Sequence, residues 1–461
     1  MRIKLEIPLT DADFRLAGCV VKHVPGDGFH AIVTDSRECS EGDLFAAIVG
    51  EHFDGEIFAG EAKSKGAFVL GRKSETADIL CNDVRATLLS LAAIRKKSLK
   101  FLKKTIAITG SNGKTTVKEF ARVILSKRFR THATDGNLNG DIGLAATVLS
   151  SPVDTEILII EMAMRHPGEI HELSRAVHPD IAIITNIGSA HIGHFASLEG
   201  IAAAKSEIAD GMSGGKILIP GGEKLLAGLP KDCTLTCSVS DPEADFFLMP
   251  LEIGATGSSF DFYSEHASFN SAFLSAPGEA VLICLCYAVA AALLSGMVVP
   301  DILSAISLIS IDNTRQKLIR ISDFALLDDS YNSSPESLEA SLKLLSLYRA
   351  TPRGALLGDM LELGARTEEF HRAAGRSAVR YGVSHLYLYG AYAPFIAAGA
   401  RDAGMSDEAI LLSDYPSPSE CAKKISEKHY PGEIILVKGS HASGLSDILY
   451  ELKKMHGGKE T

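Results

Sequence analysis

The chain has 461 residues, of which 46% are apolar and 22% charged, and its net charge is -11. This length exceeds one ordinary domain, so we expect a globular protein of about three domains. Because lysine and arginine are scattered and the net charge is negative, the composition excludes a protein whose main partner is nucleic acid.

The cysteines and the N-terminus both favour a cytoplasmic protein. The eight cysteines are spread along the chain without a C-x-x-C pair, which is typical of reduced thiols. The stretch MRIKLEIPLTDADFRL carries charges where a signal peptide needs an apolar core, so we expect no export.

Residues 1–98 are predicted to form the first domain. The strand-like runs FHAIVTDSR, GDLFAAIVG and GAFVLG alternate with turns and lead into a helical pattern, VRATLLSLAAIRKKSL. The basic run from Arg95 to Lys104 is interpreted as a helix C-terminus followed by a solvated linker.

Residues 99–314 are predicted to form the second domain. The apolar runs TIAIT, EILIIEMA, DIAIITNIG and KILIP are separated by helical patterns, which indicates a parallel sheet covered on both faces. A helix over 114–125 would place Val117, Phe120, Ala121 and Ile124 on one stripe. The serine-rich patch 238–271 suggests a small β insertion.

An uncharged segment from Ala280 to Val299, AVLICLCYAVAAALLSGMVV, has the length of a membrane span. It is rich in alanine and is flanked by Glu279 and Asp301 instead of a basic anchor. We therefore favour a buried core helix over a span and expect no stable membrane insertion.

Residues 315–461 are predicted to form a third α/β domain. The runs FALLDDS, GALLGDM, HLYLYG and EIILVKGS alternate with helical stretches, which again predicts a parallel sheet.

Polar residues follow the apolar runs of the second domain, where open parallel sheets bind ligands. The first such group is TGSNGKTTV, at Thr109 to Val117, although the usual G-x-x-x-x-G-K-[ST] pattern has glycine where this chain has Ile108. A tight strand-to-helix loop is the alternative to a phosphate site. The residues predicted to bind the nucleotide here are Gly110, Ser111, Asn112, Gly113, Lys114, Thr115 and Thr116, with Lys114 at the β- and γ-phosphates and a threonine hydroxyl on Mg²⁺.

Three further side chains are candidates for the same site. Glu161 ends the run EILII and is a candidate magnesium ligand, against the alternative of a surface glutamate. His191 follows the run DIAIITN, where a metal or phosphate role competes with a structural one. Lys205 lies on an ordinary helical pattern, and periodicity alone predicts that it is solvated.

Several segments of the second and third domains resemble the Mur ligases of peptidoglycan synthesis. They are TGSNGKTTVKE, TDGNLNGDIG, EMAMRHPGEI, TNIGSAHIGHFASLEGIAAAKSEI, DDSYNSSPES, LGDMLELGARTEEFH and LVKGS. In the first domain, TDSRECSEGDLFAAIVGEHFDGEIF looks like the family's UDP-binding domain. The likeness spans about residues 31–445. The DNPR motif of ligases that add diaminopimelate is absent. YNSSPES and GDMLELG look like the type that adds D-alanyl-D-alanine to UDP-N-acetylmuramoyl-tripeptide.

The resemblance implies an N-terminal UDP-binding α/β domain, a central P-loop ATPase-like domain with a parallel sheet, and a C-terminal Rossmann-like domain that binds the incoming dipeptide. It implies a monomeric, cytoplasmic ligase that uses ATP and Mg²⁺. ATP would phosphorylate the tripeptide carboxylate, and the amine of D-Ala-D-Ala would attack the acyl phosphate.

The resemblance also implies roles for individual residues. Lys114 would hold the transferred phosphate, and Thr115 with Glu161 would bind the first magnesium. His191 would help to hold a second magnesium, bridged by a carbamate on Lys205. The residues that the resemblance places near substrates are Arg315 and Asp329 for the nucleotide, Ser36 and Arg37 for UDP, and Asn137 and Asn139 for the muramyl group.

One segment departs from the family pattern. Where the family has G-x-H-N-x-x-N, with the last asparagine reading adenine, this chain has Ala280, Val281 and Cys284. A thiol lacks the two-sided hydrogen bonding of an amide, so we expect altered selectivity for the base. Thr314 and His441 also replace a common glycine and arginine. The alternatives are another amide ligase, such as a folylpolyglutamate synthetase, and a nucleotide-binding scaffold without turnover.

Overall fold

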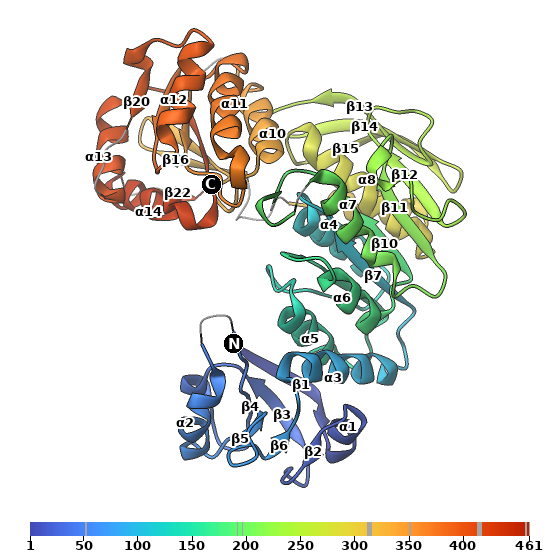
Figure 1. Cartoon of the computed structure of the whole chain (residues 1–461). Coiled ribbons are helices and arrows are strands. Elements are labelled where there is room, and N and C mark those ends of the chain that lie inside the picture. Colours follow the sequence, from blue (N-terminus) through green and yellow to red (C-terminus); the bar gives the residue numbers. More distant parts are fainter. Residues whose placement is uncertain are drawn as a thin grey trace.

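Three β-sheets follow one another along the chain, each with its own helices (Figure 1). The computed structural model describes residues 1–50, 53–190, 192–195, 197–310, 316–349, 352–412, 417–456 and 459–460. The arrangement confirms the predicted α/β class, while the domain boundaries at 98/99 and 314/315 stay predictions.

The first sheet has the strand order β1-β3-β4-β5-β6-β2. Strands β3 to β6 run parallel, and β1 and β2 join the two edges antiparallel. The buried rings of Phe14 and Phe29 meet edge to face in its core. The elements are β1 (Arg2–Leu9), α1 (Asp11–Leu16), β2 (Val20–Val21), β3 (Phe29–Val33), β4 (Leu44–Ala46), α2 (Ala59–Ser64), β5 (Phe68–Gly71), β6 (Ile79–Leu80) and α3 (Val84–Ser98).

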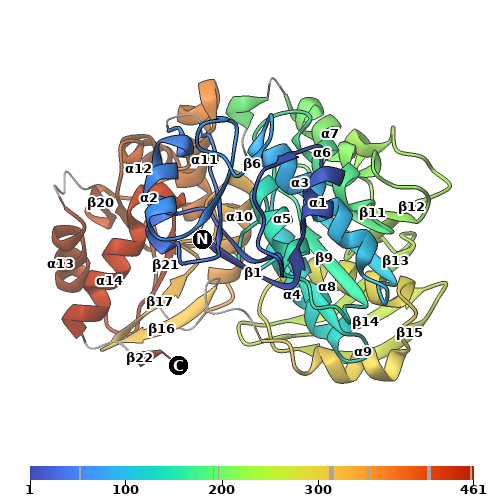
Figure 2. The ribbon, with the colours of Figure 1, turned by 90° about the horizontal axis from the view of Figure 1, so that it is seen from below.

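Helix α3 packs on α5 and α6 of the second domain. It lies between the first sheet and these helices in Figure 1 and overlaps them in the view from below in Figure 2. The prediction that the basic run ends a helix is confirmed, because α3 ends at Ser98 with Arg95 and Lys96 in its last turn. Arg95 is buried and donates to the Ile7 carbonyl, and Lys96 donates to the carbonyls of Val177 and His178. Lys96 links the two domains because it satisfies carbonyls at the C-terminal end of α6, whereas Arg95 pairs within the first domain.

The second sheet has the strand order β15-β14-β13-β12-β11-β10-β7-β9-β8. Its strands are parallel as predicted from β8 to β13, and the serine-rich insertion extends the same sheet with antiparallel β14 and β15. The strands are β7 (Lys104–Thr109), β8 (Thr131–Ala133), β9 (Ile157–Glu161), β10 (Ile181–Ile184), β11 (Lys216–Pro220), β12 (Thr234–Ser238), β13 (Phe246–Ile253), β14 (Ser258–Ser264) and β15 (Ser268–Leu274).

Helices cover both faces of this sheet (Figure 1). The predicted stripe of α4 is confirmed, because Val117, Phe120, Ala121 and Ile124 are all buried. The uncharged segment forms α8, which packs against α4 and is buried along most of its length. The helices are α4 (Lys114–Ser126), α5 (Asp141–Leu149), α6 (Glu169–Val177), α7 (Leu198–Ser206), α8 (Glu279–Leu294) and α9 (Val299–Ile306). Among the described residues, none of the helices combines the length and the hydropathy that a membrane crossing needs.

The third sheet has the strand order β20-β19-β18-β21-β17-β16-β22. Strands β20 to β17 are parallel, and β16 and β22 add an antiparallel edge. The elements are β16 (Lys317–Ile321), β17 (Phe324–Asp328), α10 (Pro335–Leu345), β18 (Arg353–Leu357), α11 (Thr367–Arg380), β19 (His385–Leu388), α12 (Ala393–Asp402), β20 (Ile410–Leu412), α13 (Pro418–Lys428), β21 (Ile434–Lys438), α14 (Leu445–His456) and β22 (Lys459–Glu460).

Candidate active site

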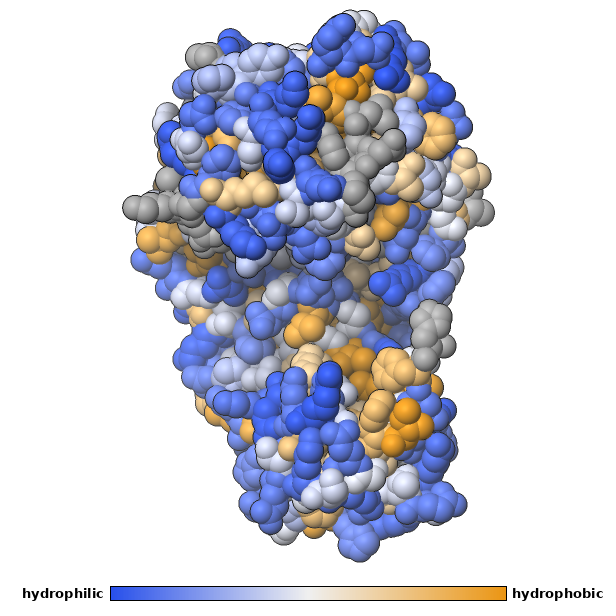
Figure 3. Space-filling model, turned by 90° about the vertical axis from the view of Figure 1, so that its left-hand side faces the viewer, coloured by the Kyte–Doolittle hydropathy of each residue, from blue (hydrophilic) through white to orange (hydrophobic). Residues whose placement is uncertain are grey.

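A cavity of about 1060 Å³ lies between the three domains, on the side of the molecule that faces the viewer in Figure 3. Its lining comes from the carboxyl ends of the second and third sheets and from the start of α3. Arg85 on α3 is paired with Asp141 at the start of α5, at 2.8 Å, so the first domain is held at the rim. This placement agrees with the rule that parallel sheets bind ligands beyond their carboxyl ends.

The glycine-rich turn joins β7 to α4 in a conformation that requires both of its glycines. Gly110 and Gly113 have φ angles of 149° and 81°. A Cβ on Gly110 would lie 1.8 Å from the Thr185 hydroxyl, and one on Gly113 would lie 3.1 Å from Cys284 Sγ. The turn therefore exposes a helix N-terminus to an anion, which is how phosphate loops bind phosphate.

The missing glycine at position 108 has a simple explanation. Ile108 is a fully buried residue inside β7 and pairs with Ile183 and Glu161 on the neighbouring strands. It lies before the turn and does not contribute to it. The turn is instead held to the end of β10 by Ser111, whose hydroxyl donates to the Gly188 carbonyl, and by the Asn112 N–H, which donates to the Asn186 side chain.

Glu161 is the last residue of β9 and contacts two other predicted site residues. Its Oε1 accepts from the Thr115 hydroxyl at 3.2 Å and from the Asn139 amide at 2.8 Å. Its Oε2 is buried and has no hydrogen-bond partner among the described residues. A carboxylate beside a threonine hydroxyl, with one oxygen unsatisfied, fits a Mg²⁺ ion, which prefers oxygen ligands.

Lys118 is a site residue that the sequence analysis missed. It lies one turn after Lys114 on α4 and its side chain is fully buried. Its Nζ donates to the Gly136 carbonyl at 2.8 Å and lies 3.9 Å from Glu161 Oε2. Its spacing from the buried Ala121 was the available signal, because positions three apart share a helix face.

Lys205 is buried, contrary to the solvated position that periodicity alone predicts. Only 3% of the residue is exposed, and no described residue accepts a hydrogen bond from it. Burial lowers the pKa of the Lys205 amine well below its ordinary value, and the nearby charge of Lys114 lowers it further. The Lys114 ammonium itself donates to the carbonyls of Gly110 and Ser111.

The remaining predicted residues are divided between the cavity, the first domain and the part of the chain that is not described. Thr116, Asn137 and Asp329 line the cavity. Ser36 and Arg37 lie in the first domain away from it, where Ser36 donates to Glu61 and Arg37 pairs with Asp35. His191 and Arg315 lie outside the described residues.

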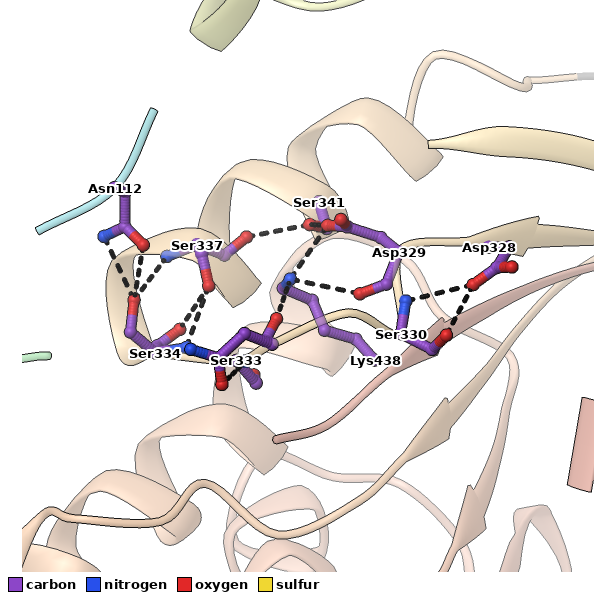
Figure 4. Close-up of polar contacts among 10 residues, drawn as sticks. Asn112, Asp328, Asp329, Ser330, Ser333, Ser334, Ser337, Ser341 and Lys438 are labelled. Carbon is purple, nitrogen blue, oxygen red and sulfur yellow. Dashed lines mark hydrogen bonds and ion pairs between the residues drawn. The ribbon is translucent and has the colours of Figure 1, made fainter. Parts of the chain in front are cut away.

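The third domain contributes a polar network at the ends of β17 and β21 (Figure 4). Asp329 accepts from Lys438 at 2.8 Å and from Ser341. Ser334, the N-cap of α10, hydrogen-bonds the Asn112 side chain of the phosphate loop at 3.1 Å. The third domain therefore contacts the phosphate loop directly.

The first turns of α8 form the apolar wall beside the phosphate loop. Ala280, Val281 and Cys284 line the cavity there, and Cys284 Sγ lies 3.9 Å from the Gly113 carbonyl. The Tyr287 hydroxyl donates to the Thr185 carbonyl. At these three positions α8 therefore presents no side-chain amide that could hydrogen-bond a nucleotide base.

Comparison with known proteins identifies the family. Three family models match consecutive parts of the chain: "Mur ligase family, catalytic domain" over residues 28–107, "Mur ligase middle domain" over 108–292 and "Mur ligase, glutamate ligase domain" over 314–441. A UDP-N-acetylmuramoyl-tripeptide--D-alanyl-D-alanine ligase of Bacillus subtilis is 34% identical and covers 92% of this chain and 93% of its own length. The chain belongs to the Mur ligase family.

Solved structures of this family resemble the Mur ligase over almost its whole length. A crystal structure of MurF from Acinetobacter baumannii has a TM-score of 0.87 and 26% identity, covering 98% of this chain and 100% of that one. The MurF ligase from Thermotoga maritima in complex with ADP has a TM-score of 0.81 and 27% identity, covering 92% and 97%.

Proposed function

We propose that this Mur ligase is an ATP-dependent amide ligase that adds D-alanyl-D-alanine to UDP-N-acetylmuramoyl-tripeptide. The observation that carries the proposal is the convergence of the phosphate loop and the Thr115 and Glu161 pair on one cavity that residues of all three domains line. The Bacillus subtilis relative bears the name of this activity. The third domain would then supply the dipeptide to the phosphate loop.

The chemistry of the reaction explains why these residues are needed together. A carboxylate and an amine do not condense in neutral water, so the carboxyl oxygen must first become a leaving group by phosphorylation. The transferred phosphate and the tripeptide carboxylate are both negative, and cations must stabilise them as they meet. Lys114 would orient the phosphates of ATP, and the helix N-terminus of α4 would stabilise their charge.

Magnesium would be held by oxygen ligands that the cavity offers. Thr115 and Glu161 are the proposed ligands of the first ion, which would neutralise phosphate charge when bound. Asn139 donates to the same Glu161 oxygen as Thr115 and leaves the other oxygen open. His191 is proposed to serve a second ion, in agreement with its place in the family motif.

A carbamate on Lys205 is the proposed second anionic ligand. Formation of a carbamate requires a neutral amine, and the burial that lowers the pKa of Lys205 favours that neutral form. The modification would replace the buried amine beside Lys114 by an anion. For the nucleotide and the UDP substrate, Arg315 with Asp329 and Ser36 with Arg37 remain the proposed contacts.

The test is phosphate release from ATP by the purified full chain. We expect release to require both UDP-N-acetylmuramoyl-tripeptide and D-Ala-D-Ala, with stoichiometric formation of the pentapeptide product by mass spectrometry. Omission of the dipeptide is the internal control. Failure of the dipeptide to stimulate release with any nucleoside triphosphate would contradict the ligase and favour a scaffold without turnover.

A further inference from the structure

Lys438 is a buried lysine at the carboxyl end of β21, and no part of the proposed chemistry uses it. It borders the cavity, yet only 2% of the residue is exposed. A lysine is rarely buried to this extent unless its ammonium is paired. Its partners therefore indicate what it does.

The ammonium of Lys438 holds loop 329–334 at two points. Nζ lies 2.8 Å from the Asp329 carboxylate, at the start of loop 329–334, and 2.9 Å from the Asn332 carbonyl further along it. The same Asp329 oxygen also accepts from the Ser341 hydroxyl of α10 (Figure 4). Charged hydrogen bonds in a buried site are strong, so the loop is restrained at both points.

The same loop contacts the second domain. Ser334 ends it and hydrogen-bonds the Asn112 side chain, 3.1 Å from Nδ2. Two residues later, Glu336 Oε1 accepts from the Ser189 N–H at 2.8 Å. Asn112 belongs to the phosphate loop, and Ser189 follows β10 beside it. A shift of loop 329–334 would break both contacts.

We infer that Lys438 is a positioning residue for amide formation: by holding loop 329–334, it keeps the third domain docked on the phosphate loop. The inference rests on the proposed function, in which the third domain presents the amine to the activated carboxylate. Misplacement of reacting groups by about 1 Å costs roughly 100-fold in rate. Loss of Lys438 should therefore impair use of the dipeptide more than binding of the nucleotide, for which its partner Asp329 is a proposed contact.

The experiment compares Lys438→Met with Lys428→Met, which changes an exposed lysine at the end of α13 in the same domain. For Lys438→Met we expect hydrogen–deuterium exchange of residues 329–338 to become at least ten-fold faster, with exchange of β18 unchanged. We also expect the KM for D-Ala-D-Ala to rise and kcat to fall, each about ten-fold or more, while the affinity for a fluorescent ADP analogue changes much less than the KM for the dipeptide. Lys428→Met should match the unmodified protein in each measurement.

A second variant keeps the inference testable if Lys438→Met folds poorly. Ser334→Ala removes the contact to Asn112 and leaves the Lys438 pairs in place, so it should give the same rise in KM. If both residues act through one contact, the double variant should lose less kcat than the product of the single losses. Multiplicative losses, or unchanged exchange of residues 329–338 in Lys438→Met, would overturn the positioning role. If the unmodified protein shows no phosphate release that depends on the dipeptide, the proposed function itself is contradicted.

Discussion

Replacement of Lys118 by methionine should destabilise the second domain strongly. The Lys118 side chain is fully buried, and its ammonium lies 2.8 Å from the Gly136 carbonyl, 3.1 Å from Glu119 and 3.9 Å from Glu161. Methionine fills most of the same volume but cannot donate, so a carbonyl and a buried carboxylate lose their nearest cation. Breaking a buried ion pair on one side costs about 3–5 kcal/mol. Glu119 is partly exposed and also pairs with Arg122, which favours the lower value.

The assay is differential scanning calorimetry of the full chain with and without ADP. The transition of the second domain is the one that ADP raises, because a ligand stabilises the state that binds it. A loss of about 3 kcal/mol should lower that transition by roughly 6–12 °C for a domain of about 200 residues. The transitions of the other two domains should move much less.

Lys127→Met is the matched control, since Lys127 is exposed at the end of the same helix. Surface substitutions of this kind change stability by about 0.5 kcal/mol or less. If Lys118→Met shifts the ADP-sensitive transition no more than Lys127→Met, the contacts of the buried ammonium do not stabilise the domain and the reasoning fails.

Three further predictions address the site and the third domain. Lys205→Ala should lose most dipeptide-dependent phosphate release and regain part of it with added acetate, and unchanged turnover would rule out the carbamate. Cys284→Asn should provide a hydrogen-bonding amide for the adenine base and raise the preference for ATP over GTP about ten-fold in kcat/KM. If the ratio of the two kcat/KM values does not change, the nucleotide base does not bind beside Cys284. Burial lowers the pKa of His371 below its ordinary value of 6.5, and its Nε2 accepts from the Met360 N–H. The unfolded chain therefore binds a proton more readily, so the thermal stability of the third domain should be complete above about pH 6.5 and fall as the pH drops below it. His371→Gln should flatten that dependence, and a wild-type melting temperature that is constant from pH 5 to 8 would contradict the assignment.

The placement of the site residues that follow apolar strands was predictable, because the carboxyl ends of parallel strands meet at one edge of a sheet. Glu161 and Thr115 come from segments 46 positions apart, and strand order alone brings them to hydrogen-bond distance. The buried stripe of α4 followed from helical periodicity in the same way.

The buried lysines were not predictable by the same means. Helical periodicity predicted a solvated Lys205, the spacing of Lys118 from Ala121 was the one available signal and was not used, and no pattern distinguished Lys438 from surface lysines. Their burial depends on loops that fold over them, such as the segment that presents the Gly136 carbonyl to Lys118. Hydropathy cannot report a polar partner that arrives from another part of the chain.

The sequence by itself determined three α/β units, a phosphate loop with two required glycines and the family to which they belong, because periodicity and turn chemistry are local. Only the tertiary structure decided which loops of different domains meet. Asn112 and Ser334 are 222 positions apart and hydrogen-bond across two domains. The apolar wall of Cys284 at the phosphate loop is likewise formed by a helix distant in the chain. Such contacts depend on how separately folded sheets pack, and that packing sums many weak interactions that no single segment contains.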